Sequence, residues 1–105
     1  MENAFKQWMQ ENYSHNELAD IANHGCEGGV GGMIYYRETL ALYEKFADEL
    51  HELLAEYKDV TGELPATVLA ALSESATTFQ NIMVWFGAEW AAHELTGGEY
   101  IEEAA

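Results

Sequence analysis

Basic residues are scarce in this sequence. Four Lys and Arg stand against nineteen Asp and Glu, so the formal net charge at pH 7 is −15. Nucleic acids and anionic membranes are themselves densely negative and would repel such a chain. The composition therefore argues against a protein that binds nucleic acid or a membrane surface directly, and it favours a basic partner.

Cysteine and long hydrophobic runs are also nearly missing. Cys26 is the single cysteine, which excludes an internal disulfide and favours a reducing compartment. No apolar run approaches the roughly 20 residues that a membrane-spanning helix needs. The first residues lack the basic and apolar regions of a signal peptide. We therefore expect a cytoplasmic protein.

Strand signals are absent as well. There is no alternating β-branched run, no Asn-Gly or Asp-Gly turn, and a single proline. A chain of 105 residues with 49% hydrophobic residues is the size of one domain with one core. We predict a single acidic all-α domain over residues 1–105, a bundle of three to five helices, with a frayed tail at 99–105.

One long amphipathic helix, at about 33–59, dominates the pattern. Apolar residues follow one another there at steps of three and four, as a single helix face requires: Met33, Tyr36, Leu40, Tyr43, Ala47, Leu50, Leu54 and Tyr57. We predict that this stripe lies in the core and that the helix packs antiparallel to the 65–95 region.

Shorter helical signals flank it. Apolar spacing predicts a helix within 2–13, and Ser14 with Glu17 forms a capping box that starts the next one. The glycine-rich segment 25–32 is either a flexible connector or a place where another helix approaches closely. Whether 65–95 is one bent helix or two stays open, because Ser73 and Ser75 interrupt its apolar pattern.

Residues 64–88 contain one charged residue, Glu74. Such a stretch is either the central buried helix of a bundle or an exposed face that seeks a partner. The aromatic side chains within and just after this stretch fit either a core or a binding patch: Phe79, Trp85, Phe86 and Trp90. We predict a symmetric homodimer through 64–90, because only this stretch would keep the acidic surfaces apart.

The acids of the long helix recur at steps of three and four, which places neighbours ~5–6 Å apart on one helix face. Phosphates along a DNA strand have a comparable spacing. The alternative is an acidic surface that serves solubility alone. The candidate partner-binding residues are Glu44, Asp48, Glu49, Glu52, Glu56, Asp59, Glu63, Glu99, Glu102 and Glu103.

Catalytic and metal-binding patterns are weak. His51-Glu52 and His93-Glu94 are adjacent, whereas a di-iron bundle uses Glu-x-x-His. His24 and Cys26 supply two ligands, which is too few for a metal site. We expect no catalytic residues, no metal, no cofactor and no enzymatic activity.

The segment from about 20 to 57 resembles a family of short acidic proteins encoded by bacteriophages, prophages and plasmids. The resemblance lies in His24-Gly25-Cys26, a glycine-spaced turn, Ile34-Tyr35-Tyr36, Thr39 and Tyr43. It implies a mobile genetic element, and small acidic proteins of such elements are often anti-CRISPR or anti-restriction inhibitors that mimic DNA. We therefore expect a non-enzymatic inhibitor in the host bacterial cell, anti-CRISPR first and anti-restriction next. The alternative is a small helical adaptor or regulatory phage protein that binds through its apolar aromatic face.

Overall fold

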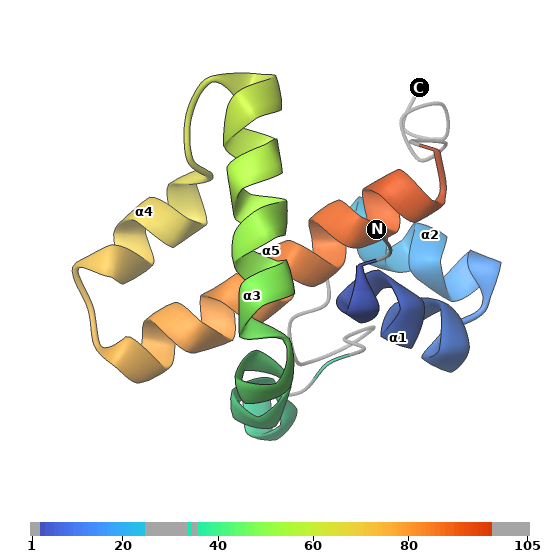
Figure 1. Cartoon of the computed structure of the whole chain (residues 1–105), viewed down its shortest axis with the longest axis horizontal. Coiled ribbons are helices and arrows are strands. Elements are labelled where there is room, and N and C mark those ends of the chain that lie inside the picture. Colours follow the sequence, from blue (N-terminus) through green and yellow to red (C-terminus); the bar gives the residue numbers. More distant parts are fainter. Residues whose placement is uncertain (1–2, 25–33, 35, 98–105) are drawn as a thin grey trace.

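The computed structural model describes residues 3–24, 34 and 36–97 (Figure 1). These residues form helices and no strands, which confirms the prediction of a small all-α bundle. The helices are α1 (Ala4–Asn12), α2 (His15–His24), α3 (Tyr36–Thr61), α4 (Ala66–Leu72) and α5 (Ala76–Leu95). The 65–95 region is thus two helices. The glycine-rich segment 25–32, with Cys26, and the tail at 99–105 lie outside the described residues.

Side chains that cap helices set several boundaries. The Asn3 side chain accepts a hydrogen bond from the Lys6 amide at 3.1 Å. The predicted capping box forms: the Ser14 amide donates to Glu17 Oε1 at 2.8 Å, and the Glu17 amide donates to Ser14 Oγ at 3.2 Å. Ser75 caps α5 in the same way by accepting from the Thr78 amide. These caps explain why the chain is divided at 14 and at 75.

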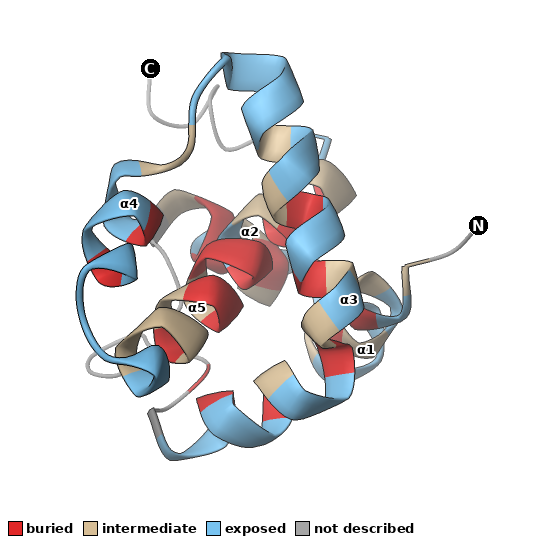
Figure 2. Ribbon diagram, turned by 60° about the vertical axis from the view of Figure 1, so that its left-hand side comes forward, coloured by how far each residue is buried: buried red, intermediate tan, exposed pale blue. Residues whose placement is uncertain are grey.

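Helix α5 is the centre of the molecule, and each of the other four described helices packs against it. Figure 2 shows how much of it is buried. Its buried residues are mostly small or apolar: Asn81, Met83, Val84, Phe86, Gly87, Ala88, Ala91 and Ala92. Of the two alternatives for 64–88, the α5 part is therefore the central buried helix. No described helix has both the length and the apolar character needed to cross a bilayer.

The long helix α3 is confirmed, but its buried face is turned from the predicted one. Leu50 is buried as predicted, whereas Leu40 is 40% exposed. Met33 lies outside the described residues, and four members of the predicted stripe are half-buried: Tyr43, Ala47, Leu54 and Tyr57. The buried positions are Thr39, Leu42, Phe46, Leu50 and Leu53. Two apolar stripes compete along this helix, so spacing alone could not choose between them. In addition, the backbone leaves helical geometry at Phe46 (φ −120°, ψ 22°), which kinks the helix between its two halves.

The prediction that α3 packs antiparallel to 65–95 is wrong. Helix α3 crosses α5 obliquely (Figure 1). At Gly87 a Cβ atom would lie 2.4 Å from Leu50 Cδ2, so the missing side chain lets the two helices approach closely there. A buried hydrogen bond from Thr39 Oγ1 to Asn81 Oδ1 ties the N-terminal part of α3 to α5. A contact made at one small residue favours a crossing over side-by-side packing.

The aromatic residues of α5 belong to the core or its margin, but they separate into different contacts. Phe86 and Trp90 both meet Tyr57 of α3 edge to face. Trp85 Nε1 donates to the Ile34 carbonyl at 2.9 Å. A second aromatic cluster, which spacing did not reveal, joins Phe5, Trp8 and Phe46 and fixes α1 on α3: centroids of Phe5 and Phe46 are 5.3 Å apart.

The phase of α3 can be tested with a matched pair of leucines. We expect Leu50→Ala to lower the free energy of unfolding by about 2–5 kcal/mol, because it removes the side chain that packs against α5 and leaves a cavity there. Leu40→Ala removes the same atoms from an exposed position and should be close to neutral. Urea denaturation of both variants measures this. Equal losses would mean that the buried face of α3 is misassigned.

Candidate functional site

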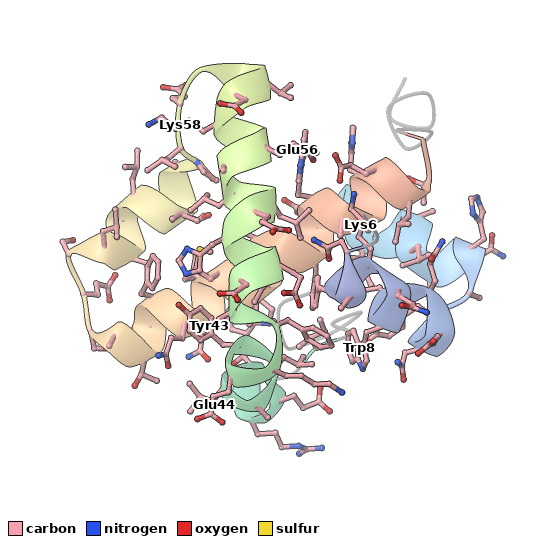
Figure 3. The ribbon with its side chains drawn as sticks, viewed as in Figure 1. Lys6, Trp8, Tyr43, Glu44, Glu56 and Lys58 are labelled. Carbon is pink, nitrogen blue, oxygen red and sulfur yellow. The ribbon has the colours of Figure 1, made fainter. Side chains whose placement is uncertain are left out.

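The exposed side of α3 carries a row of acids, which we call the acidic row: Glu44, Asp48, Glu52 and Glu56. Consecutive members are four residues apart, and all four side chains are exposed. Asp59 and Glu63 continue the exposed acids to the end of α3 and into the following loop. Figure 3 labels Glu44 and Glu56 near the two ends of the row. The fold therefore presents exposed carboxylates along α3, of which Glu56 also reaches Trp90 of α5.

Basic side chains do not neutralise most of these acids. Within the part of the chain that the structure describes, Lys6 forms an ion pair with Glu94, and no ion pair involves Asp48, Glu52 or Asp59. Lys45, although on α3, lies over the Phe46 ring at 5.2 Å from its centroid. Like charges four residues apart on a helix repel one another. Asp48, Glu52 and Asp59 therefore carry negative charge that no ion pair within the described residues offsets.

The structure separates the ten predicted partner-binding residues into groups. Six are exposed, as an interface requires: Glu44, Asp48, Glu52, Glu56, Asp59 and Glu63. Glu49 is half-buried, because it lies at the edge of the face that packs inward. The remaining predicted residues, Glu99, Glu102 and Glu103, lie outside the described residues.

Glu56 differs from its neighbours because it is bonded into the fold. Its Oε1 accepts a hydrogen bond from the indole Nε1 of Trp90 at 2.9 Å. A hydrogen bond with Glu94 is the main cause that lowers the pKa of Glu56 below 4.5; Trp90 and Lys6 lower it further, and burial opposes them. Glu56 is therefore as much a structural residue as a candidate contact.

Glu94 interacts with Glu56 and Lys6, and the sequence analysis did not predict it as a site residue. Lys6 Nζ lies 2.6 Å from Glu94 Oε1, which joins α1 to α5. Burial is the main cause that raises the pKa of Glu94 above 4.5, and the hydrogen bond with Glu56 raises it too, whereas Lys6 lowers it. We call the group formed by Lys6, Glu56, Trp90 and Glu94 the carboxyl junction. No local pattern could have identified it, since its members come from three helices.

Helix α4 presents a different kind of surface. Leu69 and Leu72, three residues apart, are 49% and 57% exposed, while Val68 and Ala71 pack inward. No charged residue occurs between 64 and 73. Since α5 is buried, the exposed apolar part of the 64–90 stretch is this face of α4. The predicted dimer surface is thereby reduced to one short helix.

The described residues contain few clusters of side chains suited to catalysis or metal binding. Residues 3–24, 34 and 36–97 contain no group of three or more His, Cys, Asp or Glu placed to hold a metal ion. Tyr43 Oη and His51 Nε2 are 2.9 Å apart at an exposed site. The ring of Phe79 lies beside His51, with centroids 6.3 Å apart. The arrangement offers charge and surface for binding.

Comparison with known proteins places the chain in a family. The family described as "Domain of unknown function (DUF7222)" matches residues 1–103. Among curated proteins and solved structures, none matches this chain.

The acidic row makes a prediction about stability. Replacing Asp48, Glu52 and Asp59 together by Asn, Gln and Asn removes repulsion, and within the described residues it breaks no ion pair. We therefore expect the melting temperature to rise by about 1–4 °C at low salt. The gain should disappear near 1 M salt, where the Debye length is about 3 Å. Glu56→Gln should have the opposite sign at pH 7, because it removes a charge that the fold stabilises. A lower melting temperature for the triple variant would show that these acids stabilise the fold and would contradict this prediction.

Proposed function

Since this chain belongs to the DUF7222 family, whose description assigns no function, we propose a function from its surface. The protein is a non-enzymatic inhibitor of a bacterial defence system that acts as an acidic mimic of DNA. Its partner is the basic nucleic-acid-binding surface of a CRISPR surveillance complex or, as the next choice, of a restriction enzyme. Its site of action is the cytoplasm of the host bacterial cell.

The observation that carries this proposal is the set of exposed carboxylates on α3, of which Asp48, Glu52 and Asp59 take part in no ion pair within the described residues. Neighbours four apart on a helix are about 5–6 Å from one another, a spacing comparable to that of phosphates along DNA. A helix held at its back by α5 presents these charges on a rigid support. Lys and Arg side chains that normally bind phosphate can donate hydrogen bonds to carboxylates in the same positions.

The resemblance to phage, prophage and plasmid proteins supports the choice of target. Defence complexes bind DNA through basic channels, and a mobile element gains from blocking them. In this proposal the acids of α3, together with Glu99, Glu102 and Glu103 of the tail, occupy the channel stoichiometrically. Long-range attraction between −15 on the inhibitor and a basic channel would speed association. No bond is made or broken, so no catalytic residue is needed.

A plating assay tests the proposal. Phage should plate better on a CRISPR-immune or a restricting strain when the protein is expressed, and the triple variant Asp48→Asn, Glu52→Gln, Asp59→Asn should lose this effect. The matched control is Glu11→Gln, Asp20→Asn, Glu74→Gln, which removes the same charge from exposed positions on other elements. The control should keep its activity.

Two results would contradict the mimic. One is equal loss of protection by both triple variants, which would make net charge rather than α3 responsible. The other is an affinity for the purified target complex that does not fall with salt, since contacts that replace phosphate are screened by ions.

A second candidate is a small helical adaptor that binds through α4, and the exposure of Leu69 and Leu72 favours it. The same face is where two copies of this acidic chain could meet with the fewest opposing carboxylates, so we place the proposed homodimer there. Sedimentation at several concentrations should then give masses above 11.8 kDa. Leu69→Ser with Leu72→Ser should restore the monomer. A monomer at all concentrations would contradict the homodimer, and the exposed face of α4 would then be a surface for a different protein.

A further inference from the structure

Helix α3 is bent near its middle. Its backbone leaves helical geometry at Phe46, and Figure 1 shows that the parts before and after this residue run in different directions. We call residues 36–45 the first half of α3 and residues 47–61 its second half. Sharp bends in helices usually occur at proline, glycine or serine, and α3 contains none of these. Contacts made by side chains therefore have to hold the bend.

Each half of α3 has its own attachment to α5. In the first half, Thr39 donates its buried hydrogen bond to Asn81. In the second half, Leu50 packs where Gly87 leaves room for it. These contacts place each half on α5, but neither of them joins one half to the other.

A hydrogen bond between Tyr43 and His51 does join the two halves. Tyr43 Oη and His51 Nε2 are 2.9 Å apart, and the centroids of the two rings are 6.0 Å apart. In a straight helix, residues eight positions apart are separated by about 12 Å along the axis. Leaning of the side chains does not shorten this distance, because both lean toward the helix N-terminus. The contact between the two rings therefore depends on the bend.

The two side chains are supported from the body of the molecule. Tyr43 is half-buried and packs against the core, and Figure 3 labels it beside the bend. The ring of Phe79 in α5 lies on His51, with 39° between the ring planes. His51 is thus held between Tyr43 and Phe79, which limits the number of positions that its ring can take.

The charge of α3 changes at the same bend. In the first half, two basic and two acidic residues cancel: Arg37, Glu38, Glu44 and Lys45. The second half has five acids and one base, which gives a net charge of −4: Asp48, Glu49, Glu52, Glu56, Lys58 and Asp59. The acidic row crosses the bend between Glu44 and Asp48. The angle at Phe46 therefore sets the direction in which the strongly negative half of α3 is presented.

We propose that Tyr43 and His51 are positioning residues, whose hydrogen bond fixes the angle between the two halves of α3 and so the direction of its acidic half toward a basic partner. The partner in this inference rests on the proposed function, whereas the angle is a property of the free protein. Neither residue supplies the charge that binds. Without the bond the two halves sample a wider range of angles, and binding has to restrict them again at a cost in affinity.

Residual dipolar couplings of the backbone amides of 37–45 and 47–61 measure this angle in the full chain by NMR. Tyr43→Phe removes one oxygen atom and keeps the ring beside His51. We expect each half to remain helical, while the two halves no longer share the alignment that they have in the unsubstituted protein. Amide hydrogen exchange at 46–51 should become faster by roughly 2–10-fold, the contribution of one hydrogen bond.

Tyr57→Phe is the matched control. It removes the same atom from another half-buried tyrosine of α3, which lies away from the bend and meets Phe86 and Trp90 through its ring. The control should keep both the alignment and the exchange rates. His51→Phe, which keeps a ring beside Phe79, should act like Tyr43→Phe. The double variant should be no worse than either single variant, because the same bond is lost once.

The proposal is overturned if Tyr43→Phe leaves the relative alignment and the exchange rates unchanged, since packing around Phe46 would then hold the bend alone. Additive effects of Tyr43→Phe and His51→Phe would also overturn it, because the two residues would then act separately.

Binding tests the positioning role. The affinity of Tyr43→Phe for the purified target complex should fall by roughly 2–10-fold at unchanged net charge, because the lost hydrogen bond no longer fixes the angle. A changed alignment with unchanged affinity would contradict the positioning role. If the unsubstituted protein does not bind the complex, the proposed function fails, and the dipolar couplings still decide whether Tyr43 and His51 fix the bend.

Discussion

The packing of every other described helix against α5 is the constraint on which the structure depends. A central helix must be free of charge on nearly all sides, and the near-neutral 64–88 stretch meets this need. The buried Ala and Gly residues keep its surface narrow enough for its neighbours to approach. The close approach of Leu50 to Gly87 helps to set where α3 crosses it.

The distribution of charge follows from this constraint. Because residues 76–88 of α5 contain no acid, most of the acids lie on the surfaces of the surrounding helices, and α3, the longest, carries the acidic row. Its inner face buries Leu42, Leu50 and Leu53 and so fixes the direction of its outer face. The surface that we propose for binding is thus the reverse side of the packing that builds the core.

The surface is not uniform in its physical role. Asp48, Glu52 and Asp59 contribute charge that no described basic residue offsets, and this charge costs stability. Glu56 belongs to the same row but is tied to Trp90 and Glu94. One helix face therefore combines residues available to a partner with a residue that joins three helices. Loss of function on changing Glu56 would not distinguish a binding role from a structural role. Changes at the other acids of the row test the binding role without that ambiguity.

The sequence by itself determined the fold class, the capping box at Ser14 and Glu17, the long helix and the acidic character of its outer side. These depend on local spacing, local hydrogen bonds and composition, which need no knowledge of distant residues. Only the tertiary structure decided which of two apolar stripes on α3 is buried, that α5 rather than α4 is the central helix, and that α3 crosses it. It also brought Lys6, Glu56 and Glu94 together. Each of these rests on contacts between helices, such as Leu50 with Gly87 and Trp90 with Glu56, whose energy depends on packing that no single segment specifies.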